Sequence, residues 1–169
     1  QNKISENDTL KFKVHNMREA IYPEISTQKV DAVCNLFTSF GYFESDVEDK
    51  KIFRSVADAL VDNGFFILDF LNEQWVKNTL VPQAITTKGD IEFHISKRIE
   101  DQHVIKDINF KDQGEDFHFF EKVKLHTLEE IGSYAEEFGF ERVKIYGDYH
   151  LGAFDRDTSP RCINVFRKL

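Results

Sequence analysis

The sequence predicts an α/β domain, and three observations support this class. An apolar run at 30–37, a helical pattern and a second apolar run at 65–71 follow one another, which is the order of a parallel crossover unit. Alternating apolar and polar residues between 92 and 124 predict antiparallel strands after this unit. A further helical pattern and two strand patterns close the chain. Since no repeat, low-complexity segment or linker interrupts the pattern, we expect one domain over residues 1–169, with 90–125 as an inserted antiparallel region.

Composition narrows the possible partners. Of the 169 residues, 41% are hydrophobic and 31% are charged, and no apolar run approaches the ~20 residues that a membrane-spanning helix needs. The net charge of -8 argues against nucleic acid, which is usually bound by a basic face. Cys34 and Cys162 both lie in apolar runs, without the spacing of a metal site or a disulfide framework. We therefore expect a cytoplasmic protein that binds neither nucleic acid nor a membrane.

Two strands are expected before the first helix. In "LKFKVHNM" the apolar residues Leu10, Phe12 and Val14 alternate with polar ones, which predicts a short strand with Asn16 at its C-terminal end. The next stretch, "VDAVCNLF", is almost continuously apolar or small. That pattern is typical of a strand covered on both faces, so we expect it at the centre of a parallel sheet.

The first helix is expected between two local signals. Ser45 and Glu48 form an S-x-x-E capping box, which predicts a helix beginning near Asp46. "DNG", ending at Gly64, supplies a residue that adopts the left-handed conformation without strain, so we expect the helix to end there. The following "FFILDFL" predicts a buried strand.

Further elements are predicted in the second half of the chain. The segments "EFHISKRI", "HVIKDINF" and "FHFFEKVKL" alternate and predict hairpin strands, which would either cover a substrate pocket or form a plain sheet edge. Thr127 and Glu130 form a second capping box, and Gly139 follows the helical pattern that they begin. "RVKIYGDY" and "RCINVFRK" predict the last two strands.

The loop after the first buried strand is the most unusual stretch. "NLFTSFGYF" holds four aromatic residues in nine positions, with Gly41 available for a tight turn. Ligands of α/β sheets bind at the carboxyl ends of the strands, so this loop is a candidate binding site. In a chain with 17 phenylalanines, however, composition alone favours ordinary core packing.

Five stretches in register resemble one family. "VHNMRE", "VDAVCNLFTSFGYF", "VADALVDNGFFILDFLN", "HTLEEIGSYAEEFGFERVKIYGDY" and "SPRCINVFRK" are similar to segments of class I S-adenosylmethionine-dependent methyltransferases of the small-molecule branch. The resemblance implies a Rossmann-like sheet, mostly parallel with an antiparallel last strand. It also implies that this chain corresponds to a family member from the end of its second helix onward.

The resemblance is incomplete at the front of the chain. The glycine-rich loop and the acidic residue that hold the cofactor in this family are absent, together with the N-terminal strands. We therefore expect the fragment alone to be inactive. A missing N-terminal segment, or a second copy of the chain, is expected to complete the sheet.

The resemblance also implies site residues. The cofactor would be S-adenosylmethionine, leaving S-adenosylhomocysteine as product, with Asn16 accepting from the adenine amino group and Met17 lying along the adenine. Asn35, Leu36 and Phe37 would form the turn beneath the methionine moiety. The expected substrate-side residues, of which the last two lie near the ends of the closing strands, are Ser39, Tyr42, Tyr149 and Arg161.

The implied chemistry leaves the catalytic residues unassigned. Methyl transfer is an in-line displacement that mainly needs orientation in a dry site, so a general base is required only for some acceptors. No metal site is expected, because no H-x-x-x-H or H-x-H pair occurs among His94, His103, His118, His126 and His150. The alternative is a non-catalytic α/β binding or interaction module, in which the aromatic loop packs into the core or against a partner.

Overall fold

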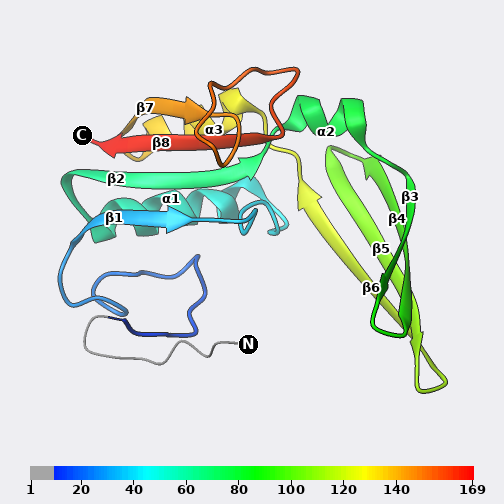
Figure 1. Ribbon diagram of the computed structural model, residues 1–169. Coiled ribbons are helices and arrows are strands. Elements are labelled where there is room, and N and C mark those ends of the chain that lie inside the picture. Colours follow the sequence, from blue (N-terminus) through cyan, green and yellow to red (C-terminus); the bar gives the residue numbers. More distant parts are fainter. Residues whose placement is uncertain (1–9) are drawn as a thin grey trace.

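The computed structural model describes residues 10–169, which form two four-stranded sheets and three helices (Figure 1). The first sheet has the strand order β1 (Val30–Asn35), β2 (Leu60–Leu71), β8 (Arg161–Lys168) and β7 (Phe140–Tyr146). The second has the order β3 (Gln83–Lys88), β4 (Ile91–Glu100), β5 (His103–Asp112) and β6 (Glu115–Lys124). The helices are α1 (Asp46–Ala59), α2 (Glu73–Thr79) and α3 (Leu128–Glu137). None of these helices is long and apolar enough to span a membrane.

The first sheet is mixed. Strands β1 and β2 pair in parallel, as the crossover pattern predicts, whereas β8 is antiparallel to both of its neighbours. The expectation of a mostly parallel sheet is thus met only in part, since a single pair of strands is hydrogen-bonded in parallel among the described residues.

Strand β1 does not lie at the centre of the sheet. It is the first strand in the order and pairs only with β2 among the described strands, and Ala32 and Cys34 are exposed. The prediction of a central strand from "VDAVCNLF" was wrong for this chain. A continuous apolar run therefore lies at an open sheet edge, which natural proteins usually protect.

The strand expected at 10–14 is absent. Leu10, Phe12 and Val14 are all exposed, and the segment has no regular secondary structure. The chain packs onto α1 further along. There the Ile21 N–H donates to Ser55 Oγ at 3.1 Å, and this hydroxyl donates to the Glu19 carbonyl at 2.7 Å.

Helix α1 begins where the sequence predicts but is capped differently. Ser45 is the N-cap residue but forms no side-chain cap, and Glu48 pairs with Arg18 instead of completing the capping box. The helix also ends earlier than expected, and the left-handed residue beyond it is Asn63 rather than Gly64. Gly64 is needed for space, since a Cβ there would lie 2.9 Å from the Val61 carbonyl oxygen.

Helix α3 forms the capping box that the sequence predicts. Thr127 Oγ1 accepts from the Glu130 N–H at 3.0 Å, and Glu130 accepts from the Thr127 N–H at 2.8 Å. Gly139, with φ of 77°, follows the helix and leads into β7. Local capping chemistry therefore predicts both ends of this helix.

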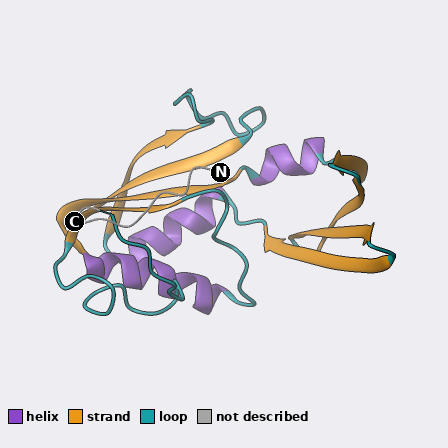
Figure 2. Ribbon diagram, turned by 60° about the horizontal axis from the view of Figure 1, so that its bottom comes forward, coloured by secondary structure: helices purple, strands orange, loops and turns teal. Residues whose placement is uncertain are grey.

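The main core lies between one face of the first sheet and helices α1 and α3. Figure 2 shows the two helices on the same side of the sheet. The largest fully buried side chains in this layer are phenylalanines: Phe40, Phe53, Phe66, Phe70, Phe140 and Phe166. On the opposite face Phe65 is 42% exposed and pairs in register with the exposed Ala32.

The second sheet is an antiparallel meander that extends away from the first (Figure 1). Three of its strands, β4 to β6, correspond to the three alternating segments of the sequence, whereas β3 and α2 were not predicted. The Lys124 N–H at the end of β6 donates to the Gly41 carbonyl at 2.8 Å, so the second sheet is tied to the aromatic loop after β1.

Candidate functional site

The aromatic loop after β1 divides its rings between core and surface. Phe40 is fully buried and Phe43 packs against the core, whereas Phe37 is 77% and Tyr42 is 48% exposed. Phe37 and Thr38 both have φ of 59°. Two consecutive non-glycine residues in the left-handed region are costly and persist only where the surroundings hold them, which often occurs at binding sites.

Asp69 of β2 holds this strained turn. Its carboxylate accepts from the Phe37 N–H at 2.8 Å, and its backbone carbonyl accepts from the Thr38 N–H at 3.3 Å. Asp69 is completely buried at the carboxyl end of β2. A carboxylate in that position must be compensated by charge and hydrogen bonds.

Arg161 and Tyr149 provide this compensation. Arg161 donates from Nε and Nη2 to Asp69 Oδ1 at 2.8 and 2.6 Å, and Nη2 also donates to Thr38 Oγ1 at 2.9 Å. The Tyr149 hydroxyl donates to Asp69 Oδ2 at 2.9 Å. Partial burial, and then the bond to Asp69, raise the pKa of Tyr149, which keeps this hydroxyl protonated as a donor. We call these five residues, Phe37, Thr38, Asp69, Tyr149 and Arg161, the Asp69 cluster.

Three members of the Asp69 cluster are residues expected at the site, Phe37 on the cofactor side and Tyr149 and Arg161 on the substrate side. Arg161, Tyr149 and Phe37 were chosen from the sequence, and the structure brings them together. Asp69 and Thr38 were missed, although a signal existed: Asp69 is the one charged residue in the apolar segment "FFILDFL". A lone acidic residue near the end of a buried strand needs a partner, and that partner lies 92 positions away in the sequence.

Of the two expected adenine-side residues, Met17 lies near the end of β1, beside Asn35 of the expected methionine-side turn. Asn35 Nδ2 lies 3.7 Å from Met17 Sδ, so the structure brings these two residues together. Asn35 Oδ1 is buried without a hydrogen-bond partner among the described residues. Asn16 is turned into its own segment, where its Oδ1 accepts from the Arg18 N–H and Nε–H at 3.2 Å each.

The remaining predicted residues lie along the loop itself. Leu36 is 40% exposed and stands beside the exposed Phe37. The Ser39 hydroxyl donates to the Leu36 carbonyl at 2.6 Å, so it closes the turn. Burial, with the nearby charge of Glu121, raises the pKa of Tyr42 and keeps it neutral.

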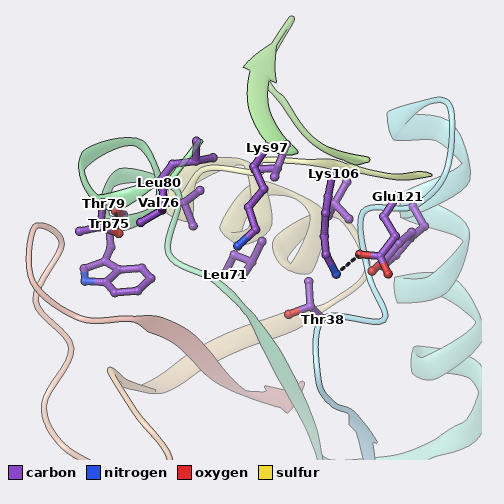
Figure 3. A pocket seen from close by; sticks show the side chains of 13 residues that line it. Thr38, Leu71, Trp75, Val76, Thr79, Leu80, Lys97, Lys106 and Glu121 are labelled. Carbon is purple, nitrogen blue, oxygen red and sulfur yellow. Dashed lines mark hydrogen bonds and ion pairs between the residues drawn. The ribbon is translucent and has the colours of Figure 1, made fainter. Parts of the chain in front are cut away.

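A pocket of about 450 Å³ lies between this loop, α2 and the second sheet (Figure 3). Thr38 and Tyr42 reach it from the loop, and Leu71 reaches it from β2. Its other lining residues are mostly apolar: Trp75, Val76, Thr79, Leu80, Val81, Lys97, Val104, Lys106, Glu121 and Val123. Thr38 belongs both to this pocket and to the Asp69 cluster.

A second polar group lies at the start of α1. His126 Nε2 and Asp49 Oδ2 are 3.0 Å apart, and both residues are buried. Asp46 lies close enough to these two residues for the three to resemble a set of metal ligands, but Asp46 also pairs with Lys124. In the described part of the chain, this group joins α1 to the segment before α3.

Comparison with known proteins identifies the fold. No family profile and no curated protein matches the sequence. The structure is similar to an S-adenosylmethionine-dependent methyltransferase from Clostridium acetobutylicum, with a TM-score of 0.77 and 16% identity over 92% of this chain and 63% of that one. It is also similar to the CcbJ methyltransferase from Streptomyces caelestis, with a TM-score of 0.76 and 15% identity over 92% of this chain and 66% of that one.

A third similar structure contains the cofactor. CalS10, an amino pentose methyltransferase from Micromonospora echinaspora with bound S-adenosylmethionine, matches with a TM-score of 0.65 and 14% identity over 92% of this chain and 63% of that one. The chain thus spans less than two thirds of the length of each of these three proteins. It has the fold of S-adenosylmethionine-dependent methyltransferases.

Proposed function

We propose that this chain carries part of the active site of an S-adenosylmethionine-dependent methyltransferase that acts on a small molecule. The observation that carries the proposal is the Asp69 cluster. A buried carboxylate holds a strained turn at the carboxyl end of β1, and the same turn borders a largely apolar pocket. Strain held in this way is typical of a binding turn with a fixed geometry. The likeness to methyltransferase structures gives this geometry its chemical interpretation.

The turn fits the cofactor. Exposed apolar side chains at Leu36 and Phe37, the thioether of Met17 and the unpartnered Asn35 Oδ1 offer apolar contacts and one acceptor. An aromatic face also attracts a cationic sulfonium. Asn16 would contribute an acceptor to the adenine only in competition with Arg18. When bound, S-adenosylmethionine supplies an electrophilic methyl group on a sulfonium.

The substrate side is formed by Tyr42, Ser39, Tyr149 and Arg161 in this proposal. Tyr42 lines the pocket directly, whereas Ser39 acts by closing the turn. Tyr149 and Arg161 hold Asp69 and thereby position Thr38 at the pocket wall. We assign no general base, since the described residues do not decide between an amine and a hydroxyl acceptor.

The alternative is a non-catalytic binding or interaction module. The open edge of β1 and the exposed Phe65 favour an interaction, because such an apolar edge is a template for strand pairing. Under either proposal, a further polypeptide segment or a second copy of the chain covers this edge. The two proposed functions therefore differ in whether the protein binds the cofactor. Both of them expect the edge of β1 to be covered.

One calorimetric titration separates the two functions. S-adenosylhomocysteine is titrated into this chain and into the longest natural polypeptide that contains it. Binding to the longer polypeptide, weakened or lost in this chain alone, supports the methyltransferase. An intact protein that binds no S-adenosylhomocysteine would leave only the interaction module.

A further inference from the structure

A row of three charged side chains crosses the second sheet at the pocket. Lys97 of β4 is in register with Lys106 of β5, and Lys106 is in register with Glu121 of β6. Lys106 Nζ lies 3.2 Å from Glu121 Oε2, so these two charges compensate each other. Figure 3 shows this ion pair on one side of the pocket.

Lys97 is left without a compensating charge. It is half-buried and lines the pocket, and its ammonium group forms no ion pair within residues 10–169. In Figure 3 its side chain extends into the pocket toward Leu71. Like charges opposite each other on a sheet repel, so the position directly across from Lys106 is unfavourable for an unpaired lysine. A ligand with one negative charge would relieve this repulsion.

The rest of the pocket suits an apolar or aromatic body. Trp75 and Val76 of α2 form one wall, and Val104 and Val123 of the second sheet form another. Trp75 is the single tryptophan of the sequence and presents a large flat surface. Dianions are disfavoured, because Glu121 lies on the same wall and one unpaired ammonium matches one negative charge.

We propose that this pocket binds the methyl acceptor as an amphipathic monocarboxylate, with the carboxylate on Lys97 and the apolar body against Trp75. The assignment of the ligand as the acceptor rests on the proposed function. The binding preference itself does not, because it depends only on the described pocket. Lys97 is then a specificity-determining residue that acts by charge pairing.

Trp75 fluorescence tests the proposal in the chain as it stands. Three probes share one phenylpropyl skeleton: 3-phenylpropionate, 3-phenylpropionamide and 3-phenylpropylamine. We expect the carboxylate to bind about 10-fold or more tightly than the amide, since a hydrogen bond to a charged group is stronger than a neutral one. The amine should bind more weakly than the amide.

Variants assign the preference to Lys97. Lys97→Met should reduce the preference for carboxylate over amide to about 2-fold or less, and Lys97→Arg should retain most of it. Lys111→Met is the matched control, because Lys111 is an exposed lysine of β5 that does not line the pocket. It should leave all three affinities unchanged. Circular dichroism establishes that each variant is folded.

Two results would overturn the proposal. One is equal binding, or no binding, of the three probes by the unmodified chain. The other is a carboxylate preference that survives in Lys97→Met. Titration with S-adenosylhomocysteine is read separately: a protein that selects the carboxylate but binds no S-adenosylhomocysteine retains the anion pocket and loses the methyltransferase assignment.

Discussion

At the scale of single residues, Asp69 connects the fold to the candidate site. Its side chain is 1% exposed and that of Arg161 is 14% exposed, so their ion pair is largely removed from water. Breaking a buried pair leaves an uncompensated charge, which costs much more than losing an exposed pair. The carboxylate also holds the two left-handed residues of the turn.

Asp69→Asn should therefore destabilise the protein by about 3–5 kcal/mol. The matched control is Glu141→Gln, which removes the carboxylate of the exposed Glu141–Arg167 pair, where N and O are 2.7 Å apart. That change should cost about 1 kcal/mol or less. Urea unfolding measures both, and equal losses would show that Asp69 contributes no more than a surface charge.

Substitution of the exposed Phe37 should lower cofactor affinity while leaving the stability of the fold nearly unchanged. Because the side chain is 77% exposed, Phe37→Ala should change the free energy of unfolding by about 0.5 kcal/mol or less. If the ring contacts the sulfonium, affinity for S-adenosylmethionine should fall by about 5- to 30-fold, for a contact worth about 1–2 kcal/mol, whereas affinity for the uncharged thioether of S-adenosylhomocysteine should fall less.

Tyr42 provides the comparison for this prediction. Tyr42→Ala should leave cofactor affinity unchanged and lower turnover, since Tyr42 lines the pocket and Phe37 does not. Calorimetry on the longer natural polypeptide measures both affinities. An equal loss of cofactor affinity in the two variants would refute the division of roles between Phe37 and Tyr42.

At the scale of elements, the aromatic loop is clamped to the second sheet at Gly41. Gly41 has φ of 84°, and a Cβ there would lie 3.1 Å from both the Lys124 carbonyl oxygen and the Phe70 ring. The Gly41 carbonyl accepts from the Lys124 N–H at the same place. Loop, β2 and the end of β6 therefore meet at one residue without room for a side chain.

Gly41→Ala should destabilise the protein more than Gly114→Ala. Gly114 has φ of 88° with open space around its Cβ position, so its substitution carries the backbone cost alone, about 1 kcal/mol. At Gly41 the crowding adds to this cost, for a total of about 2–4 kcal/mol. Thermal or urea unfolding compares the two, and similar losses would contradict the clamp.

The elements also show what the sequence could predict. Alternation identified β4 to β6, because each strand there pairs locally with the next one, and the Thr127–Glu130 box identified α3 from a contact within one turn. The same alternation at 10–14 predicted a strand that the described residues do not form, because a pattern alone does not supply a strand to pair with. Asp69 and Thr38 were missed because their partner, Arg161, comes from the far end of the chain.

At the scale of the whole molecule, the described residues cover one face of the first sheet with helices and leave apolar side chains exposed on the other. Helices α1 and α3 cover the core face, whereas Cys34 and Phe65 are exposed. The edge of β1 and this face are the surface on which a further segment or a second copy would pack under both proposed functions.

The two cysteines report on this surface. Cys34 is exposed, whereas Cys162 is buried and its burial raises the pKa of the thiol, so only Cys34 should react rapidly with a thiol reagent at pH 7–8. The sign follows from the raised pKa, which leaves less thiolate at a given pH. Both thiols should react after unfolding in urea.

Coverage of the open face should protect Cys34. In any longer natural polypeptide that contains this chain, or at concentrations where the chain self-associates, the rapid reaction should slow by about tenfold or more. Cys162 should remain unreactive in both cases and serves as the internal control. Unchanged Cys34 reactivity in the longer polypeptide would show that nothing packs over β1 there.

We propose that the turn held by Asp69 binds the cofactor. Hydrogen exchange of the longer natural polypeptide, measured with and without saturating S-adenosylhomocysteine, tests it most directly. The cofactor should slow exchange in peptides covering 35–38, while peptides covering the turn that joins β5 (His103–Asp112) to β6 (Glu115–Lys124) should be unchanged. Bound S-adenosylhomocysteine that leaves exchange at 35–38 unaltered would contradict the account.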